Sequence, residues 1–252
     1  MDTARVGIWV LDMKTGLERR LLSYGYSPSW SPDGKKLAFE SGAQIFVMSA
    51  DGANVQQLTF MGKNFSPCWH PNGEAIVYDS NLGGSSGGYT VRIMRSDGSA
   101  QRPLCASTAG ERRESCWDPT GVRVVLAWSP GGDVVSSQVY AIDSLTCSPT
   151  RLTHSEATNR TPRYSPNGHQ IAFSAHQFSE SLPQIWIMNA DGGSPRRATS
   201  LGGANPTWSP DGQKIAYVRD DETRNSPQLG VIWMVDIGNG QEKQLTFHGG
   251  GP

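Results

Sequence analysis

Residues 27–39 read SPSWSPDGKKLAF, and most of this phrase returns later in the chain. Its turn, written Pro-Asp-Gly, Pro-Asn-Gly or Pro-Thr-Gly, occurs five times, with glycines 39, 48, 47 and 44 residues apart. An aromatic residue precedes each turn and a short apolar run follows it. Self-similarity at this period indicates a repeat architecture, in which each repeat is one supersecondary unit.

The repeated positions have structural reasons. Proline presets φ for the second turn position, and glycine accepts the left-handed conformation that a tight hairpin needs. The aromatic residues are predicted to be core residues between packed sheets. The structural repeat positions are Trp30, Asp33, Gly34, Trp69, Gly73, Trp117, Gly121, Tyr164, Gly168, Trp208, Asp211 and Gly212.

A second signature follows each turn. In the first repeat the apolar run Ile45–Met48 leads to Asp51-Gly52 and then to Leu58-Thr59. One repeat therefore predicts four short strands, which we call a, b, c and d. Strands b and c are apolar at consecutive positions, so both of their faces should be buried. Four-stranded antiparallel sheets covered on both faces are the blades of a β-propeller, an all-β fold.

We expect a single domain over residues 1–252. An N-terminal c–d half repeat has no a–b half before it, which predicts a six-bladed propeller with one incomplete blade. The chain closes with this short blade, or it is a piece of a longer protein that supplies the missing strands. An uncovered strand edge invites self-association. The half-blade is predicted at 6–22 and the complete repeats at about 27–59, 66–105, 114–153, 161–199 and 205–246.

The pattern P-x-W-S-P-D-G-K-x-I-A-F, followed by I-W-x-M-x-x-D-G and R/Q-x-L-T, resembles the propeller repeat of the TolB (WD40-like) family. Related repeats occur in the propeller domains of prolyl oligopeptidase-type and tricorn proteases. The resemblance covers residues 6–247. It implies a periplasmic scaffold that binds a lipoprotein and other envelope proteins. A protein or peptide partner, no cofactor, and a periplasmic or extracellular location are therefore expected.

Composition excludes two classes of partner. A net charge of −1 gives no electrostatic footprint for nucleic acid. No apolar run approaches the roughly 18 residues of a membrane span, so membrane insertion is not expected. The N-terminal residues lack the layout of a signal peptide. The four cysteines contain no C-x-x-C pair, and we expect them to be buried free thiols.

Loop variation indicates where a partner binds. In a four-stranded blade the a–b and c–d turns share one face, and the b–c loops and d–a links share the other. The b–c loops are the variable ones, at 79–88, 175–183 and 219–229. Variation on one face of a repeat protein usually marks the binding face. We therefore predict partner binding at this b–c/d–a face or at the mouth of the propeller channel.

Six residues are candidates for partner binding. The arginines lie just before or within strands a, where a basic channel mouth can receive a carboxylate or an acidic peptide. One histidine lies in a d–a link and the other in a b–c loop. The alternative interpretation is ordinary surface residues, with the arginines paired to nearby glutamates. The candidates are Arg112, Arg113, His154, Arg160, Arg163 and His176.

The sequence predicts no catalytic residue and no metal ligand. Gly84–Gly88 satisfies G-x-S-x-G, but a nucleophile elbow needs a strand–turn–helix setting. The five histidines show no metal-ligand spacing. We therefore expect a non-enzymatic propeller. Two alternatives remain: the substrate-gating propeller of a prolyl oligopeptidase-type peptidase, and an enzyme similar to oligogalacturonate lyases, which use a histidine-rich site.

Overall fold

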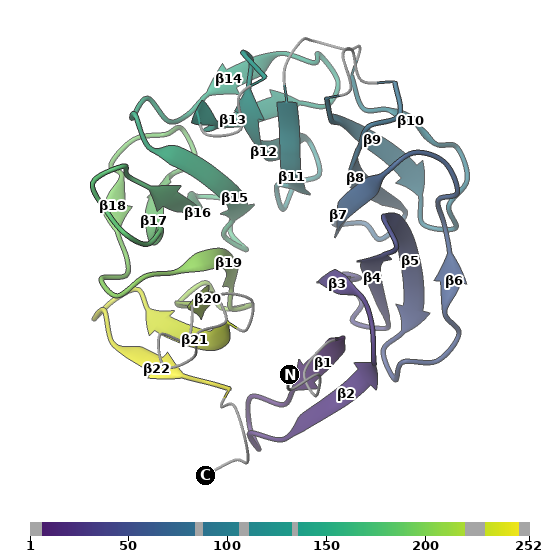
Figure 1. Ribbon diagram of the computed structural model, residues 1–252, viewed down its shortest axis with the longest axis horizontal. Coiled ribbons are helices and arrows are strands. Elements are labelled where there is room, and N and C mark those ends of the chain that lie inside the picture. The colour runs from purple at the N-terminus through teal and green to yellow at the C-terminus, as the bar shows by residue number, and fades with distance from the viewer. Residues whose placement is uncertain (1–6, 84–87, 106–110, 133–135, 220–229, 247–252) are drawn as a thin grey trace. The chain divides into compact units, whose positions relative to one another are not determined.

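The computed structural model describes residues 7–83, 88–105, 111–132, 136–219 and 230–246. Regular structure in these residues consists of β-strands, and within them no helix is long and apolar enough to cross a membrane. The strands form five four-stranded sheets and one two-stranded sheet, each in chain order (Figure 1). Sheets of this kind are propeller blades, so the predicted fold class is confirmed.

The strands of each blade carry the roles a, b, c and d in order. The first blade consists of β3 (Tyr26–Trp30), β4 (Lys36–Ser41), β5 (Gln44–Ser49) and β6 (Gln56–Gln57). The second consists of β7 (Asn64–Trp69), β8 (Ala75–Ser80), β9 (Thr90–Arg95) and β10 (Arg102–Pro103). The third consists of β11 (Glu111–Trp117), β12 (Arg123–Ser129), β13 (Gln138–Asp143) and β14 (Pro149–Arg151). The fourth consists of β15 (Thr158–Tyr164), β16 (Gln170–His176), β17 (Gln184–Asn189) and β18 (Arg196–Arg197). The fifth consists of β19 (Ala204–Trp208), β20 (Lys214–Arg219), β21 (Val231–Asp236) and β22 (Glu242–Gln244).

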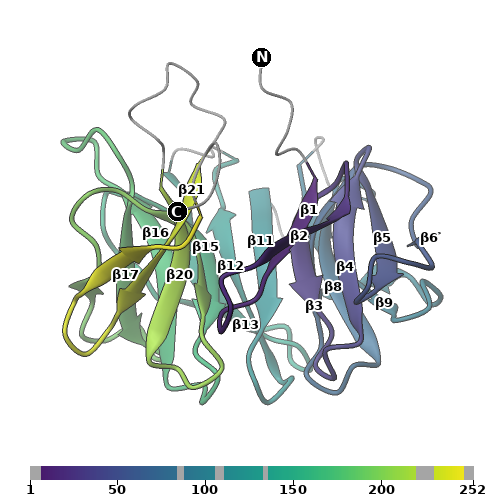
Figure 2. The ribbon, with the colours of Figure 1, turned by 90° about the horizontal axis from the view of Figure 1, so that it is seen from below.

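The N-terminal sheet holds two strands, β1 (Ile8–Leu11) and β2 (Glu18–Leu22), which Figure 2 shows as an antiparallel pair. They occupy the predicted half repeat. Within the described residues the structure therefore has five complete blades and one half-blade. Five complete blades and the half-blade agree with the prediction, but a sixth complete blade is not present in these residues.

The chain divides into two compact units, Met1–Trp117 and Asp118–Pro252. Unit 1 contains β1 to β11 and unit 2 contains β12 to β22. Each unit is described by itself below. The expectation of a single domain over residues 1–252 stays a prediction.

Strands b and c form the core. In unit 2, all but the first residue of β12 are buried, and so are five of the seven residues of β16. Val125 and Val139 of the third blade pack with Ile171, Phe173 and Met188 of the fourth in one apolar cluster. On the other face of the fourth blade, Ala172 and Ile185 pack with Ile215 and Tyr217 of the fifth, so a neighbouring blade covers each face of its strands b and c. The prediction from the apolar runs is confirmed.

The repeated Ser-Pro-Asp-Gly turn joins strands a and b. In the first blade the Ser31 hydroxyl donates to Asp33 Oδ1 at 2.7 Å, and the Lys35 amide donates to the same oxygen at 3.1 Å. The five repeat glycines all have positive φ, from 68° at Gly34 to 76° at Gly73. Glycine takes this conformation without a steric penalty, which explains its recurrence.

The Leu-Thr signature closes strand d onto strand c. Thr59 Oγ1 accepts a hydrogen bond from the Ile45 amide at 2.9 Å and donates to Gln44 Oε1 at 2.7 Å. The same threonine–glutamine pair recurs as Thr153 with Gln138 and as Thr199 with Gln184. The threonine therefore supplies the last rung of the c–d ladder with its side chain.

Each strand a contains a bulged residue in the left-handed region. The bulge leaves a backbone N–H that the regular ladder does not bind, and at Ser66, Glu114 and Asn205 a side chain of the preceding blade accepts it. Ser66 N donates to Glu40 Oε2 at 2.9 Å, and Asn205 N donates to Ser174 Oγ at 3.1 Å. These bonds join consecutive blades through their inner strands. The bulged residues, with φ from 49° to 61°, are Ser27, Ser66, Glu114, Thr161 and Asn205.

The prediction that every repeat tryptophan is a core residue is wrong for Trp30. Trp69 and Trp117 are buried, but 47% of Trp30 is exposed. In unit 2, Trp208 Nε1 donates to the Arg163 carbonyl on the preceding strand a at 3.0 Å. Trp30 lacks this neighbour because the half-blade before it, as described, consists of strands c and d alone.

The prediction of free thiols is also wrong. Cys68 and Cys116 form a disulfide, and Cys105 and Cys147 are disulfide-bonded as well. All four cysteines lie in the described residues, and none is free. Cys68 and Cys116 each precede a repeat tryptophan, so they occupy equivalent positions on strands a of consecutive blades. Equivalent positions on consecutive blades lie side by side, which brings the two thiols within bonding distance.

Candidate binding pocket in the fourth blade

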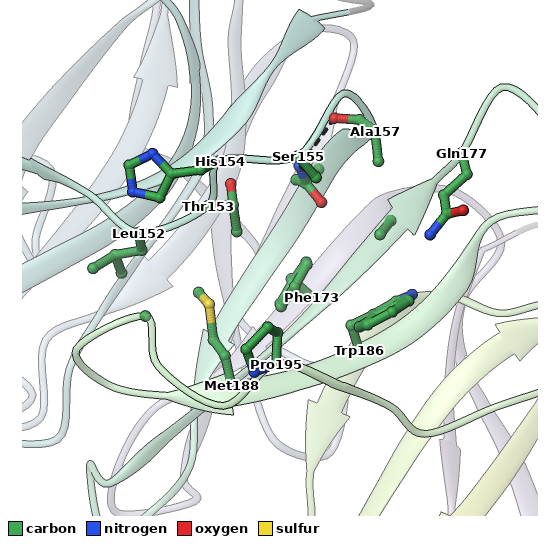
Figure 3. A pocket seen from close by; sticks show the side chains of 13 residues that line it. Leu152, Thr153, His154, Ser155, Ala157, Phe173, Gln177, Trp186, Met188 and Pro195 are labelled. Carbon is green, nitrogen blue, oxygen red and sulfur yellow. Dashed lines mark hydrogen bonds between the residues drawn. The ribbon is translucent and has the colours of Figure 1, made fainter.

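A cavity of about 290 Å³ lies in unit 2, where the link from the third blade reaches the fourth (Figure 3). The d–a link, strands b and c of the fourth blade, the start of its b–c loop and its c–d turn all contribute side chains. The lining residues are Leu152, Thr153, His154, Ser155, Ala157, Asn159, Phe173, Ala175, Gln177, Trp186, Met188, Gly192 and Pro195.

The walls of the pocket are apolar. In Figure 3, Phe173, Met188 and Pro195 lie in the middle, with Trp186 at one end and Leu152 at the other. None of the thirteen described lining residues is Asp, Glu, Lys or Arg. The pocket therefore suits an uncharged, apolar group.

A hydrogen-bonded network fixes the d–a link over the pocket. The buried Asn159 amide donates to the Ala157 carbonyl at 3.0 Å and to Ser155 Oγ at 3.2 Å. The Gln138 amide donates to the Ser155 and Ala157 carbonyls at 3.0 and 2.9 Å. Because the link's carbonyls are held by buried side chains, the rim of the pocket is preorganised.

Close approach at Gly192 brings the c–d turn against the link. Gly192 has a φ of 90°, and a Cβ placed there would lie 2.6 Å from the Leu152 carbonyl oxygen. A side chain at this position would push the turn away from Leu152. Glycine is therefore required for the floor of the pocket to form.

The two predicted histidines lie at or beside the pocket. His154 is exposed and lines it. His176 is exposed at the end of β16, with Nε2 3.0 Å from the Glu180 carbonyl oxygen, and the next residue, Gln177, lines the pocket. The fifth histidine, His248, lies outside the described residues, as do most of Gly84–Gly88 and the third variable loop.

The four predicted arginines lie two in each unit, so the basic channel mouth expected from them stays a prediction. In unit 1, Arg112 is buried, which lowers the pKa of its guanidinium. Arg113 pairs with Glu111 at 2.6 Å and lies 4.3 Å from the centre of the Tyr89 ring. In unit 2, Arg160 and Arg163 are half-buried on β15.

Sequence reasoning identified His154 but missed the apolar wall of the pocket. A usable signal lay in the repeats: Phe173 and Pro195 stand where the second and fifth repeats carry a tyrosine and a polar residue. For metal binding, no group of three or more His, Cys, Asp or Glu side chains suited to an ion was found in the described part of the chain.

Comparison with protein families gives a match over most of the repeats. The model of the TolB beta propeller domain matches residues 91–250, which is more than half of the chain. The chain belongs to this family. The resemblance inferred from the repeated turn is confirmed.

Two curated relatives share the family's repeat. The uncharacterized protein Atu1656 of Agrobacterium fabrum is 30% identical over 211 residues, covering 77% of this chain and 66% of that protein. The uncharacterized peptidase YuxL of Bacillus subtilis is 26% identical over 149 residues, covering 46% of this chain and 22% of the peptidase. The chain therefore spans less than two thirds of the length of either relative.

Solved structures of TolB proteins and of an oligogalacturonate lyase share the fold. A provisionally assigned TolB from Agrobacterium tumefaciens superposes with a TM-score of 0.81 at 24% identity, covering 94% of this chain and 86% of that one. TolB from Acinetobacter baumannii gives 0.77 at 22% identity, covering 93% and 58%. An oligogalacturonate lyase in complex with manganese gives 0.61 at 18% identity, covering 95% and 72%. At these identities the likeness concerns the fold alone.

Proposed function

We propose that this TolB propeller domain is a non-catalytic scaffold that binds a protein or peptide partner through its b–c/d–a face. The observation that carries this proposal is the uncharged apolar pocket in unit 2. The d–a link and the b–c loop, the two kinds of segment that form this face, both contribute lining residues. An apolar pocket with a polar rim is the usual form of a specific binding site.

Exposed apolar side chains on the same segments support this proposal. Phe178 in the b–c loop is 76% exposed, and Leu201 in the next d–a link is 65% exposed. Large apolar groups at a protein surface are suited to contacts with a partner. Leu145 is 85% exposed but lies in the c–d turn of the third blade, at the opposite end of the strands. It provides a matched control.

Two enzyme-related roles are the alternatives. A propeller that gates substrate entry to a peptidase is supported by the match to YuxL, of which this chain covers a small part. A lyase-like enzyme is supported by the fold likeness to oligogalacturonate lyase. Both require groups beyond the pocket described here: a hydrolase domain for the first, and a histidine-rich site for the second.

We also propose that the propeller has six blades, because the half-blade provides two strands of a sixth. β1 and β2 carry the c and d roles of a sixth blade, and Trp30 beside them is half exposed. Association of two copies through this incomplete blade would produce a dimer. Light scattering behind size exclusion tests this: a dimer that dissociates with Trp30→Ala supports self-association, and a monomer at all concentrations contradicts it.

The disulfides support an oxidising location. Two disulfides use all four cysteines, and disulfides persist in the bacterial periplasm and outside cells, where thiols are not kept reduced. We therefore propose a periplasmic or extracellular location. Thiol titration of the unfolded chain isolated from its native source tests this: free thiols would contradict it.

The scaffold proposal is tested with paired surface substitutions. Peptides are first enriched from a random display library on the full chain. Leu201→Asp should weaken their binding by about tenfold or more, since a charge on the b–c/d–a face disrupts an apolar contact. Leu145→Asp should leave binding unchanged. Equal losses from both variants, or no enriched peptide, would contradict the proposal.

A further inference from the structure

The second blade shows one way in which the repeat fills the position of the pocket. Tyr78 on strand b directs its hydroxyl to Gln101 Oε1 at 3.3 Å. Gln101 in turn donates to the Leu58 carbonyl of the preceding blade at 2.9 Å. A Cβ placed at Gly98 would lie 3.2 Å from Leu58, the same approach that Gly192 makes to Leu152. A tyrosine–glutamine pair therefore occupies the space between the link and the turn.

The fifth blade fills the same position with another polar pair. Tyr217 donates to Glu242 Oε2 at 2.7 Å, and Glu242 pairs with Arg219. The Arg219 guanidinium lies 4.1 Å from the centre of the Trp233 ring, which is the strand c partner of Tyr217. Burial raises the pKa of the Tyr217 hydroxyl. The site is thus filled by polar groups that satisfy one another.

The fourth blade lacks both members of this pair. Phe173 pairs with Trp186 across strands b and c as Tyr217 pairs with Trp233, but it has no hydroxyl. Pro195 lies seven residues after Met188, as Gln101 lies seven residues after Met94. Proline has no long side chain to reach the Leu152 carbonyl. Compared with the second and fifth blades, these two residues therefore leave the 290 Å³ cavity unfilled.

The size and walls of the cavity define what fits. An apolar cavity of about 150 Å³ binds benzene, so a volume of 290 Å³ accommodates one aromatic ring with its linking atoms. Phe173 and Trp186 offer ring contacts, and the Met188 thioether favours an aromatic neighbour. A cationic or anionic side chain would find no counter-charge among the lining residues.

We propose that this cavity is an anchor pocket for a single aromatic side chain of a bound peptide. The inference rests on the proposed function, because it assigns the residue class that the b–c/d–a face recognises. Gln177 at one end of the pocket carries the amide donors and acceptor that a peptide backbone next to the anchor needs (Figure 3). A buried aromatic anchor in a pocket is the usual centre of a binding surface.

The decisive variant restores the pair that the repeat uses elsewhere. Phe173→Tyr combined with Pro195→Gln should fill the pocket with the pair of the second blade, whose backbone surroundings are the same. The fold should tolerate this change, which a thermal melt verifies. If the double variant does not fold, Ala175→Leu fills the pocket from strand b. Leu145→Ala, in the c–d turn of the third blade and outside the pocket lining, is the matched control.

The pocket is tested by itself with small probes. Methionine methyl resonances of the full chain are followed by NMR during titration with the N-acetyl amides of phenylalanine, tryptophan, leucine and alanine. The Met188 signal is assigned with Met188→Leu. The aromatic amides should shift this signal with a Kd about fivefold lower than that of the leucine amide. The pocket-filling variant should abolish the shift, and Leu145→Ala should not. An unshifted Met188 signal, or equal aliphatic binding, would overturn the inference.

A display selection separates the pocket from the wider proposal. Peptides enriched on the wild-type chain should carry an aromatic residue and lose about tenfold or more in affinity on the filled variant. Enriched peptides that bind the filled variant equally well would overturn the pocket assignment and leave the scaffold proposal intact. If no peptide is enriched, the scaffold proposal fails, and the amide titration still decides the pocket.

Discussion

At the scale of single residues, Asp79 makes stability depend on pH. Its buried carboxylate accepts hydrogen bonds from the Ser115 hydroxyl at 2.7 Å and from the Glu114 amide, and burial raises its pKa to about 7. The folded state therefore holds a proton that the unfolded state releases near pH 4. Stability from this group is full below that pH and falls as pH rises towards 7.

Urea unfolding from pH 5 to 8 measures this effect. The wild type should lose up to about 2 kcal/mol relative to Asp79→Asn across this range, since one pKa unit corresponds to about 1.4 kcal/mol. Asp33→Asn is the control, because hydrogen bonds from Ser31 and Lys35 lower the pKa of the exposed Asp33, and its titration lies below this range. Parallel curves for wild type and Asp79→Asn would contradict the assignment.

Gly192 supports a second prediction at the residue scale. Gly192→Ala and Gly212→Ala both place a side chain at positive φ, which costs about 1 kcal/mol. At Gly212 the new Cβ would lie 3.7 Å from Pro166, an ordinary contact, whereas at Gly192 it would meet the Leu152 carbonyl. Gly192→Ala should therefore lower the free energy of unfolding by about 1–3 kcal/mol more than Gly212→Ala. Equal losses in urea unfolding would show that the close approach is unimportant.

At the scale of elements, the Cys68–Cys116 disulfide ties β7 to β11. The two cysteines are 48 residues apart, and closing a loop of this length stabilises a fold by about 4 kcal/mol in the chain-entropy model. The paired change Cys68→Ser and Cys116→Ser should lower the free energy of unfolding by about 2–4 kcal/mol. Chemical unfolding of both forms measures the difference. Reductant should destabilise the variant less than the wild type, and an unchanged midpoint in the variant would contradict this.

Some features of these elements can be predicted from the sequence, and others cannot. Turns and strands b and c follow from local rules, because Gly34 needs positive φ and consecutive apolar residues need two covered faces. The disulfides and the exposure of Trp30 depend on which residues lie opposite one another in neighbouring blades. The pocket could not be predicted from the sequence for a similar reason. It arises from what Phe173 and Pro195 lack, and only the filled equivalents in other blades make that absence visible.

At the scale of the whole molecule, the repeated blade has a structural role, and in the fourth blade it also has the proposed binding role. The repeated turns, the threonine–glutamine pairs and the bulges of strands a join strands and blades, and they recur from one blade to the next. The pocket lined by Phe173 and Pro195 lies in the fourth blade. Family membership accounts for the shared features, and the proposed binding role rests on the feature that departs from the repeat.

Hydrogen–deuterium exchange of the full chain with and without a display-enriched peptide tests the binding face most directly. We expect added protection at 152–157, 177–183 and 199–203, which are the d–a links and the b–c loop on the b–c/d–a face. The a–b turn at 165–169 and the c–d turn at 143–147 should exchange as in the free chain. Protection centred on those turns, with the d–a links unchanged, would contradict the account.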